Sequence, residues 1–122
     1  MKNLQEFTKL YMAQWNEIDE ERRRAIISEI WATEADDYLP TQPKPYHGLD
    51  EINGRVSSTN KKWVQEGGHS FKATGTPTVN HDSLRITWDM LDAEGTVKAS
   101  GFDFLILNED DKIIRAYQFV GK

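Results

Sequence analysis

The chain has 122 residues, of which 20 are acidic and 15 basic, giving a net charge of −5 at pH 7. That length predicts a single domain, residues 1–122, with a core that needs no disulfide or metal to hold it. The acidic balance argues against nucleic acid as a partner, and the lack of cysteine excludes thiolate catalysis and cysteine-based zinc sites. The sequence offers no signal peptide and no apolar run long enough to span a membrane, so we expect a cytoplasmic protein.

Two helices are predicted at the start of the chain. Over residues 3–18 apolar side chains recur every three or four positions, which is one face of a helix. That face consists of Leu4, Phe7, Tyr11, Trp15 and Ile18. Asp19 is placed to cap a second helix, because its carboxylate can accept from free backbone N–H groups. The buried stripe of this second helix holds Ile26, Ile27, Ile30 and Trp31.

A loop and a third helix follow. The segment 33–39 is short and ends at Pro40, so the chain extends there, and three prolines within 40–45 predict a loop. Gly48 and Asp50 open the third helix, and Gly67-Gly68 ends it. Its apolar side carries Ile52, Val56, Trp63 and Val64.

After Gly68 the apolar pattern changes to period two, which predicts strands. Four are expected, over residues 69–79, 81–91, 97–107 and 112–120. Short turns between consecutive strands predict an antiparallel meander, and helices followed by strands indicate an α+β fold. Since apolar residues occupy both registers of these strands, we expect one face to pack on the helices and the other on a second subunit.

Asp103 is the first candidate for chemistry, because it is a carboxyl group embedded in an apolar strand. Burial without a partner raises the pKa of a carboxyl, and a neutral acid can donate a hydrogen bond to a ligand oxygen. The alternative is a structural role in which Asp103 accepts from a core Trp or Tyr. Tyr11 and Trp15 lie one turn apart on the first helix, where their rings could wall a cavity or simply fill the core.

A second candidate group lies on one predicted strand. His81 and Arg85 are four residues apart and share a face, whereas Trp88 falls on the opposite face. His81 with Arg85 could orient an anionic or carbonyl ligand, or could form a surface or interface pair. Asp36 and Asp37 are neighbours in an extended segment, so they point in opposite directions and do not form a dyad. No metal-ligand spacing links the three histidines, so we expect neither a metal nor a cofactor.

Taken in order, several short motifs resemble the nuclear transport factor 2-like superfamily, in particular its SnoaL-like and ketosteroid-isomerase-like branch. The motifs are residues 11–16, residues 31–35, the proline-rich loop into Gly48, His81-x3-Arg85-x2-Trp88, residues 101–104, and the segment 111–121. The resemblance covers almost the whole chain. It implies a cone-shaped fold in which three helices pack on a curved, mainly antiparallel sheet that encloses an apolar pocket. It also implies a homodimer formed through the sheet.

The resemblance implies roles for particular residues. Ketosteroid isomerases build an oxyanion hole from a first-helix Tyr and a protonated Asp on the sheet, a known example of pKa tuning, and Tyr11 and Asp103 fall at the matching places. The isomerase base is not kept, because Leu39 precedes Pro40 where an Asp would stand, and Asp37 lies one pleat step earlier. Polyketide cyclases of the branch use an acidic residue as acid and base, for which Asp103, Asp37 and His81 are candidates.

These expectations give a leading hypothesis and a rival. The leading hypothesis is a cofactor-independent isomerase or cyclase that transfers a proton next to the carbonyl of an apolar substrate. Asp103 and Tyr11 would bind the enolate oxygen, and His81 or Asp37 would move the proton. The expected substrate-binding residues are Trp15, Tyr38, Arg85, Trp88 and Phe119. The rival is a non-catalytic module that binds a small hydrophobic ligand, or a dimeric scaffold for protein binding.

Overall fold

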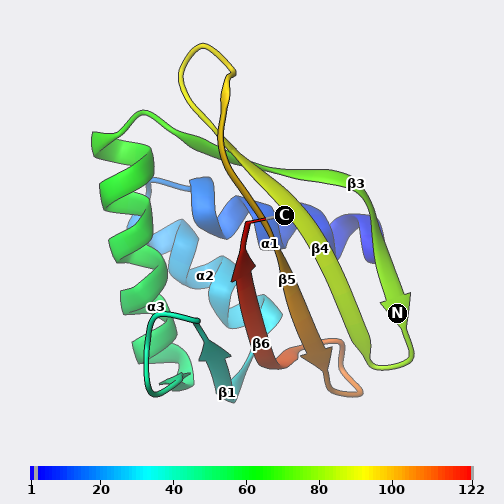
Figure 1. Cartoon of the computed structure of the whole chain (residues 1–122). Helices are drawn as coiled ribbons and strands as arrows, with labels where there is room; N and C mark the ends of the chain where they lie inside the picture. Colours follow the sequence, from blue (N-terminus) through cyan, green and yellow to red (C-terminus); the bar gives the residue numbers. More distant parts are fainter. Residues whose placement is uncertain (2, 122) are drawn as a thin grey trace.

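The computed structural model describes Met1 and residues 3–121 (Figure 1). Its elements in chain order are α1 (Leu4–Asn16), α2 (Glu20–Ile30), β1 (Trp31–Tyr38), β2 (Tyr46–His47), α3 (Gly48–Thr59), η1 (Asn60–Glu66), β3 (Ser70–Asn80), β4 (Ser83–Leu91), β5 (Val97–Leu107) and β6 (Ile113–Val120). The α+β order of helices followed by a meander is confirmed. Within the described residues, no helix is long and apolar enough to cross a membrane.

Six strands form one sheet in the order β2-β1-β6-β5-β4-β3. The meander from β3 to β6 is antiparallel as predicted, while β1 joins its far side parallel to β6. The prediction of four strands was therefore wrong by two. Strand β1 was not recognised as part of the sheet because its pairing partner lies about 80 residues further along the chain, where no turn signal links the two.

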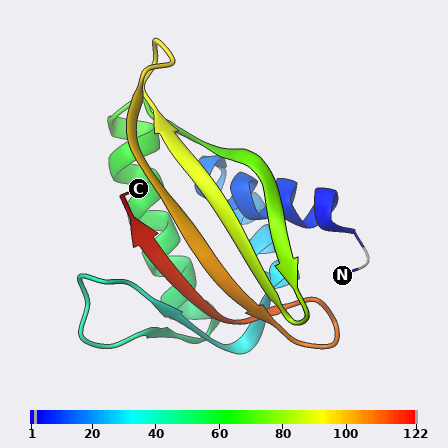
Figure 2. The same ribbon diagram turned by 45° about the vertical axis from the view of Figure 1, so that its right-hand side comes forward.

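All three helices lie on one side of the sheet, and the opposite side is left uncovered (Figure 2). The sheet curves but does not close on itself, since β2 and β3 remain as its two edges. The predicted packing of three helices on a curved, mainly antiparallel sheet is confirmed, and because the sheet stays open, the helices supply the remaining walls of the space above it. We call the side that faces the helices the inner face, and the uncovered side the outer face.

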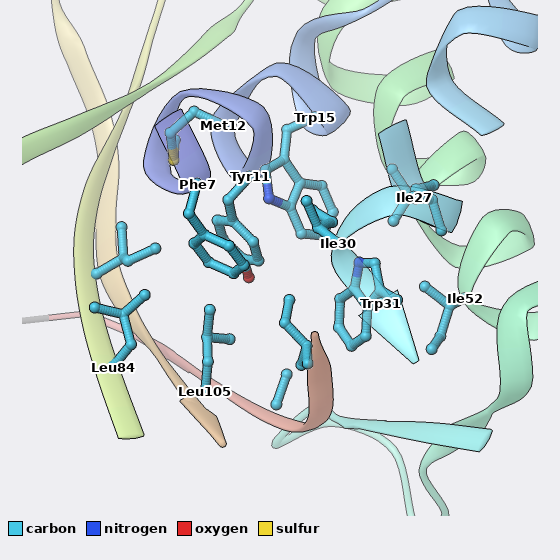
Figure 3. Packing of buried hydrophobic residues seen from close by; sticks show 14 of the residues in the cluster. Phe7, Tyr11, Met12, Trp15, Ile27, Ile30, Trp31, Ile52, Leu84 and Leu105 are labelled. Carbon is cyan, nitrogen blue, oxygen red and sulfur yellow. The ribbon is translucent and has the colours of Figure 1, made fainter. Parts of the chain in front are cut away.

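Strand alternation decides which side chains reach the core. Buried residues on β4 are Leu84, Ile86, Trp88 and Met90, and those on β5 are Gly101, Asp103, Leu105 and Leu107. Figure 3 shows Phe7, Tyr11 and Trp15 projecting from α1 into this core, with Leu84 and Leu105 below them. Trp88 shares the inner face with Leu84 and Ile86, as the sequence predicted.

The helix boundaries follow local signals. The Asp19 carboxylate accepts from the backbone N–H of Arg22 at 3.0 Å, so the predicted cap of α2 is confirmed. Helix α1 ends at Asn16, and Ile18 beyond it is 64% exposed, so its predicted place on the buried face is wrong. The third predicted helix reaches Glu66 only by changing to the wider π form over Asn60–Glu66. Such π segments are uncommon and often lie beside functional sites.

Candidate functional site

A hollow of about 560 Å³ lies between the inner face of the sheet and the elements α1, α3 and η1. That volume falls within the range of small-molecule sites, roughly 300–1,000 Å³. The apolar part of its wall consists of Met12, Trp15, Leu39, Trp63, Phe71, Trp88, Met90, Ala99 and Val120. The polar part consists of Arg55, Thr59, His69, Lys98, Asp103 and Gln118. The hollow is thus an apolar space with a few polar groups, as small-molecule sites usually are.

Asp103 places its carboxyl at the wall of the hollow from an inward position on β5. The Tyr11 hydroxyl donates a hydrogen bond to Asp103 Oδ2, and the Trp88 indole N–H donates to Oδ1 at 3.1 Å. The side chain of Gln118, the register partner of Asp103 on β6, is also hydrogen-bonded to the carboxyl. Asp103 is only 2% exposed. Three side chains therefore fix one buried carboxyl in a single orientation.

Arg55 is the second polar group at the wall, and the sequence reading did not identify it. Its Nη2 donates to Gln118 Oε1 at 2.9 Å, so Gln118 connects Arg55 to Asp103. Its guanidinium carbon lies 4.4 Å from the ring centroid of Trp15, which is a cation–π contact. Its Nε lies 3.5 Å from Asp37 Oδ2, an ion pair too long for a good hydrogen bond. Arg55 Nε and Nη1 and Asp37 Oδ2 are buried and make no hydrogen bond within the described structure.

Burial controls the protonation of this group of residues. Desolvation raises the pKa of Asp103 above its ordinary value, although hydrogen bonds from Tyr11 and Trp88 and the charge of Arg55 partly oppose the shift. Desolvation likewise raises the pKa of Asp37 to about 6, against the opposing charge of Arg55. Burial, together with the neighbouring negative charge of Asp103, raises the pKa of Tyr11, so its hydroxyl stays protonated and donates. Burial thus favours the protonated form of all three groups, and shifted pKa values of this kind are common at functional sites.

Five of the nine predicted site residues come together here. Asp103, Trp15 and Trp88 line the hollow. Tyr11 and Asp37 are buried directly behind it, each in contact with a lining residue: Tyr11 with Asp103 and Asp37 with Arg55. As predicted, Asp36 and Asp37 point in opposite directions, and the outward Asp36 pairs with His47.

The other four predicted residues lie away from the hollow. His81 is in the turn between β3 and β4, with a φ of 53°, so it does not belong to the predicted strand. Arg85 is on the outer face, where its guanidinium lies 4.3 Å from the centroid of the Phe102 ring. Tyr38 stacks on Tyr117 at 4.9 Å and Phe119 stacks on Phe102 at 4.7 Å, both on the same outer face. Arg85, Tyr38 and Phe119 lie away from the hollow because side chains alternate along a strand and each of the three occupies an outward position.

Five polar residues that line the hollow were not among the predicted site residues: Arg55, Thr59, His69, Lys98 and Gln118. Arg55 had a signal, because it lies between Ile52 and Val56 on the apolar side of its helix. Gln118 had a weaker one, as the only polar residue on an inward register near the end of β6. His69 had none, because its place depends on the way the chain leaves η1 to pack its ring against Trp63. Among residues 1 and 3–121, no group of three or more metal-binding side chains is gathered.

Comparison with known proteins gives structural rather than sequence matches. Neither a family model nor a curated protein matches the sequence. A structure described as a "putative isomerase of the SnoaL-like family" from Agrobacterium tumefaciens str. C58 is similar over 100% of both chains, at 26% identity and a TM-score of 0.87.

Two further structures share the fold. A nuclear transport factor 2-like protein of unknown function from Exiguobacterium sp. 255-15 matches 95% of this chain and 98% of its own, at 21% identity and a TM-score of 0.71. A protein of unknown function with a cystatin-like fold from Methylobium petroleophilum PM1 matches 98% and 76%, at 15% identity and a TM-score of 0.72. At these identities the likeness concerns the fold alone.

Proposed function

Because the chain belongs by its structure to the nuclear transport factor 2-like superfamily, in its SnoaL-like branch, we propose that it is a cofactor-independent enzyme. It transfers a proton at the carbon next to the carbonyl group of an apolar substrate. This is isomerase or cyclase chemistry, and a relative with the same fold carries a provisional isomerase description.

The observation that supports this proposal is the position of Asp103. It is the one carboxyl among the described residues that line the hollow. Its pKa is raised by burial, which brings an aspartate closer to the range of an effective general base. In the proposed step, the Asp103 carboxylate takes the proton from the carbon and returns it to the substrate. The C–H electron pair moves onto the carbonyl oxygen, whose negative charge the guanidinium of Arg55 stabilises.

Tyr11 and Asp37 are positioning residues in this scheme, because neither lines the hollow. Tyr11 fixes the Asp103 carboxyl through its hydroxyl, and Asp37 holds Arg55 from behind. The proposed roles thus differ from the isomerase pattern, in which the Tyr itself binds the substrate oxygen. The wall formed by Trp15, Phe71 and Trp88 would hold the apolar body of the substrate.

Hydrogen–deuterium exchange tests the proposal directly. A panel of aromatic and cyclic ketones is incubated with the protein in D₂O, and loss of the α-proton signal is followed by NMR. We expect the wild type to accelerate exchange in at least one ketone and Asp103→Asn to slow it by about 10²–10⁴-fold, the usual contribution of acid–base catalysis. Asp89→Asn is the control, because Asp89 pairs with Ser100 on β5 and does not line the hollow. Equal rates for wild type and Asp103→Asn, or no exchange with any ketone, would contradict the proposal.

The rival function is binding without chemistry, and one observation favours it. Leu39 lines the hollow at the place where the resemblance leads one to expect a base. A binding module would retain ligands with unchanged α-protons, and Asp103→Asn would then alter affinity alone. The exchange experiment therefore separates the two functions.

A homodimer formed through the outer face is also proposed. Five aromatic residues cover this face and form what we call the outer aromatic cluster: Tyr38, Phe102, Phe104, Tyr117 and Phe119. No helix covers them, and Phe119 is 46% exposed. A second copy would present the same aromatic surface, which suits a two-fold interface.

A further inference from the structure

Arg55 is a buried cation in an apolar wall whose hydrogen-bonding capacity is only partly used. The residue is 7% exposed, and its Nη1 and Nε make no hydrogen bond within the described structure. A buried donor without an acceptor is costly, by about 1–3 kcal/mol and more when charged. Asp37 compensates part of the charge, but its Oδ2 is 3.5 Å from Nε and is itself without a hydrogen bond. A ligand oxygen would supply the acceptor that Arg55 lacks.

The charges along the wall point to the sign of that ligand. The whole chain is acidic, with a net charge of −5, yet the hollow is lined by two cations, Arg55 and Lys98, and by one carboxyl, Asp103. Lys98 is half-exposed and 3.7 Å from Asp92, so its charge is shared with a neighbour outside the wall. Arg55 is therefore the buried cation that an incoming anion would meet.

The apolar part of the wall indicates the chemical character of the rest of the ligand. Trp15, Phe71 and Trp88 surround the space with aromatic surface, which suits an aromatic or cyclic apolar body. A planar guanidinium binds a carboxylate through two parallel hydrogen bonds more strongly than it binds a neutral oxygen. Gln118 lies between Arg55 and Asp103, so a group held by Arg55 lies close to the proposed proton-transfer group.

From these contacts we infer that the substrate is an apolar 2-oxo acid. Arg55, whose Nε and Nη1 are both without an acceptor, holds an oxygen of its carboxylate together with the adjacent carbonyl oxygen on which the negative charge develops, while Asp103 acts on the carbon next to the carbonyl group. The inference rests on the proposed function for the reaction, but its binding part stands on Arg55 alone. Phenylpyruvate has the required features: an aromatic body, a carbonyl group with an acidic neighbouring C–H, and a carboxylate. In the proposed step the carbon loses its proton to Asp103 and the enolate regains one from the same carboxyl, so no co-reactant is needed.

Binding is tested first with an inert matched pair, 3-phenylpropanoate and 3-phenylpropanamide, by titration calorimetry. We expect the wild type to bind the acid about tenfold more tightly than the amide or better, because hydrogen bonds to charged groups are the stronger ones. Arg55→Gln should abolish that preference. Arg85→Gln, which removes a guanidinium on the outer face, should retain it. Arg55→Gln leaves the Asp37 carboxyl without its partner. The double variant Asp37→Asn with Arg55→Gln removes that carboxyl as well, and it should also lack the preference for the acid.

The outcomes are distinct. Equal affinity for acid and amide, no binding of either at millimolar concentration, or a preference that survives Arg55→Gln would overturn the inference. Turnover is tested separately by deuterium exchange at C3 of phenylpyruvate and at the matching carbon of its neutral analogue phenylacetone. A preference for the acid without any exchange would leave the ligand class standing and refute the reaction. Exchange of phenylacetone as fast as of phenylpyruvate would support the reaction and refute the ligand class.

Discussion

Asp103 accepts hydrogen bonds from Tyr11 and Trp88, and both bonds stabilise its charged form. The pKa of Asp103 is nevertheless raised, because burial has the larger effect. The two effects oppose each other, so the donors tune the pKa of Asp103 rather than simply holding the side chain. This arrangement suits a group that must gain and lose a proton in each cycle. Removing either donor should therefore change the pH dependence of the reaction.

Tyr11→Phe tests that tuning. Loss of the hydroxyl removes a donor that lowers the pKa of Asp103, so the pKa rises further. The pH at which deuterium exchange reaches half its maximum should therefore move upward in this variant. Tyr38→Phe, which alters a tyrosine of the outer aromatic cluster, should leave the profile in place. An unchanged profile in Tyr11→Phe would show that Tyr11 does not act through Asp103.

Asp37 gives a prediction about stability. Its pKa is raised from an ordinary value of 3.8 to about 6 in the folded protein. Between these values the folded chain binds a proton that the unfolded chain has lost. This proton contributes stability that is fully present below pH 3.8 and is lost as the pH rises through about 6.

Urea unfolding at several pH values measures the effect. Relative to Asp37→Asn, the wild type should lose about 2 kcal/mol in free energy of unfolding between pH 4 and pH 7, since each pKa unit corresponds to about 1.4 kcal/mol and part of the effect is already lost at pH 4. The comparison uses the change with pH, because the variant also alters the ion pair with Arg55. Parallel pH dependences in the two proteins would contradict the assignment.

The sequence predicted the acidic residues of this site, Asp37 and Asp103, but not its buried basic residue, Arg55. Asp103 was visible because a carboxyl stands out in an apolar strand. Arg55 lies between Ile52 and Val56 on the apolar side of its helix, but this signal was overlooked because arginine is an ordinary residue in a helix. His81 was placed by counting residues along a strand, which fails where the strand gives way to a turn with positive φ. For Arg85 the count was right, and it lies opposite to Trp88, on the face away from the hollow.

At the scale of elements, Gly101 fixes how β4, β5 and β6 approach one another. A Cβ at this position would lie 2.3 Å from the carbonyl oxygen of Phe119 and 2.7 Å from the ring of Trp88. The contact with Phe119 is with backbone, which cannot rotate away. Gly101 therefore allows the Trp88 indole to lie against the strand and reach Asp103.

Gly101→Ala should consequently destabilise the protein, by about 3 kcal/mol for an overpacked core position. Gly54→Ala is the matched control, because its Cβ would meet nothing within 4 Å in the middle of α3. That control should stabilise the protein by about 0.5–1 kcal/mol through helix propensity. Urea unfolding of both variants measures the difference, and equal stabilities would show that the close approach at Gly101 is unimportant.

The elements themselves were predicted well where periodicity was local. The meander and the three helices follow from spacing and turn residues, which depend on neighbours in the sequence. The pairing of β1 with β6 and the π segment η1 could not be predicted, since each depends on contacts made only in the folded chain. The π segment places Trp63 at the wall of the hollow, so without this segment the sequence could not predict that Trp63 belongs to the site.

For the whole molecule, the one-sided packing of the helices leaves the outer aromatic cluster uncovered, and the proposed homodimer would cover it with a second copy. Light scattering coupled to size-exclusion chromatography should give a mass near twice the 14.1 kDa of the chain. Phe119→Glu should shift that mass to the monomer, because a carboxylate among the aromatic rings of an interface loses its hydration without a partner. Val97→Glu adds the same charge at another exposed apolar site and should leave the dimer intact. A monomeric wild type would rule the interface out.

The proposed chemistry requires a buried carboxyl at the wall of the hollow that can exchange protons. The carboxyl-carbon NMR resonance of Asp103, assigned by its loss in Asp103→Asn, reports this property directly when titrated with pH. We predict a midpoint above the ordinary aspartate value of 3.8, and a higher midpoint still in Tyr11→Phe. A midpoint at or below 3.8, unaltered in that variant, would mean that Asp103 is a permanently charged structural group, and would contradict the proposed chemistry.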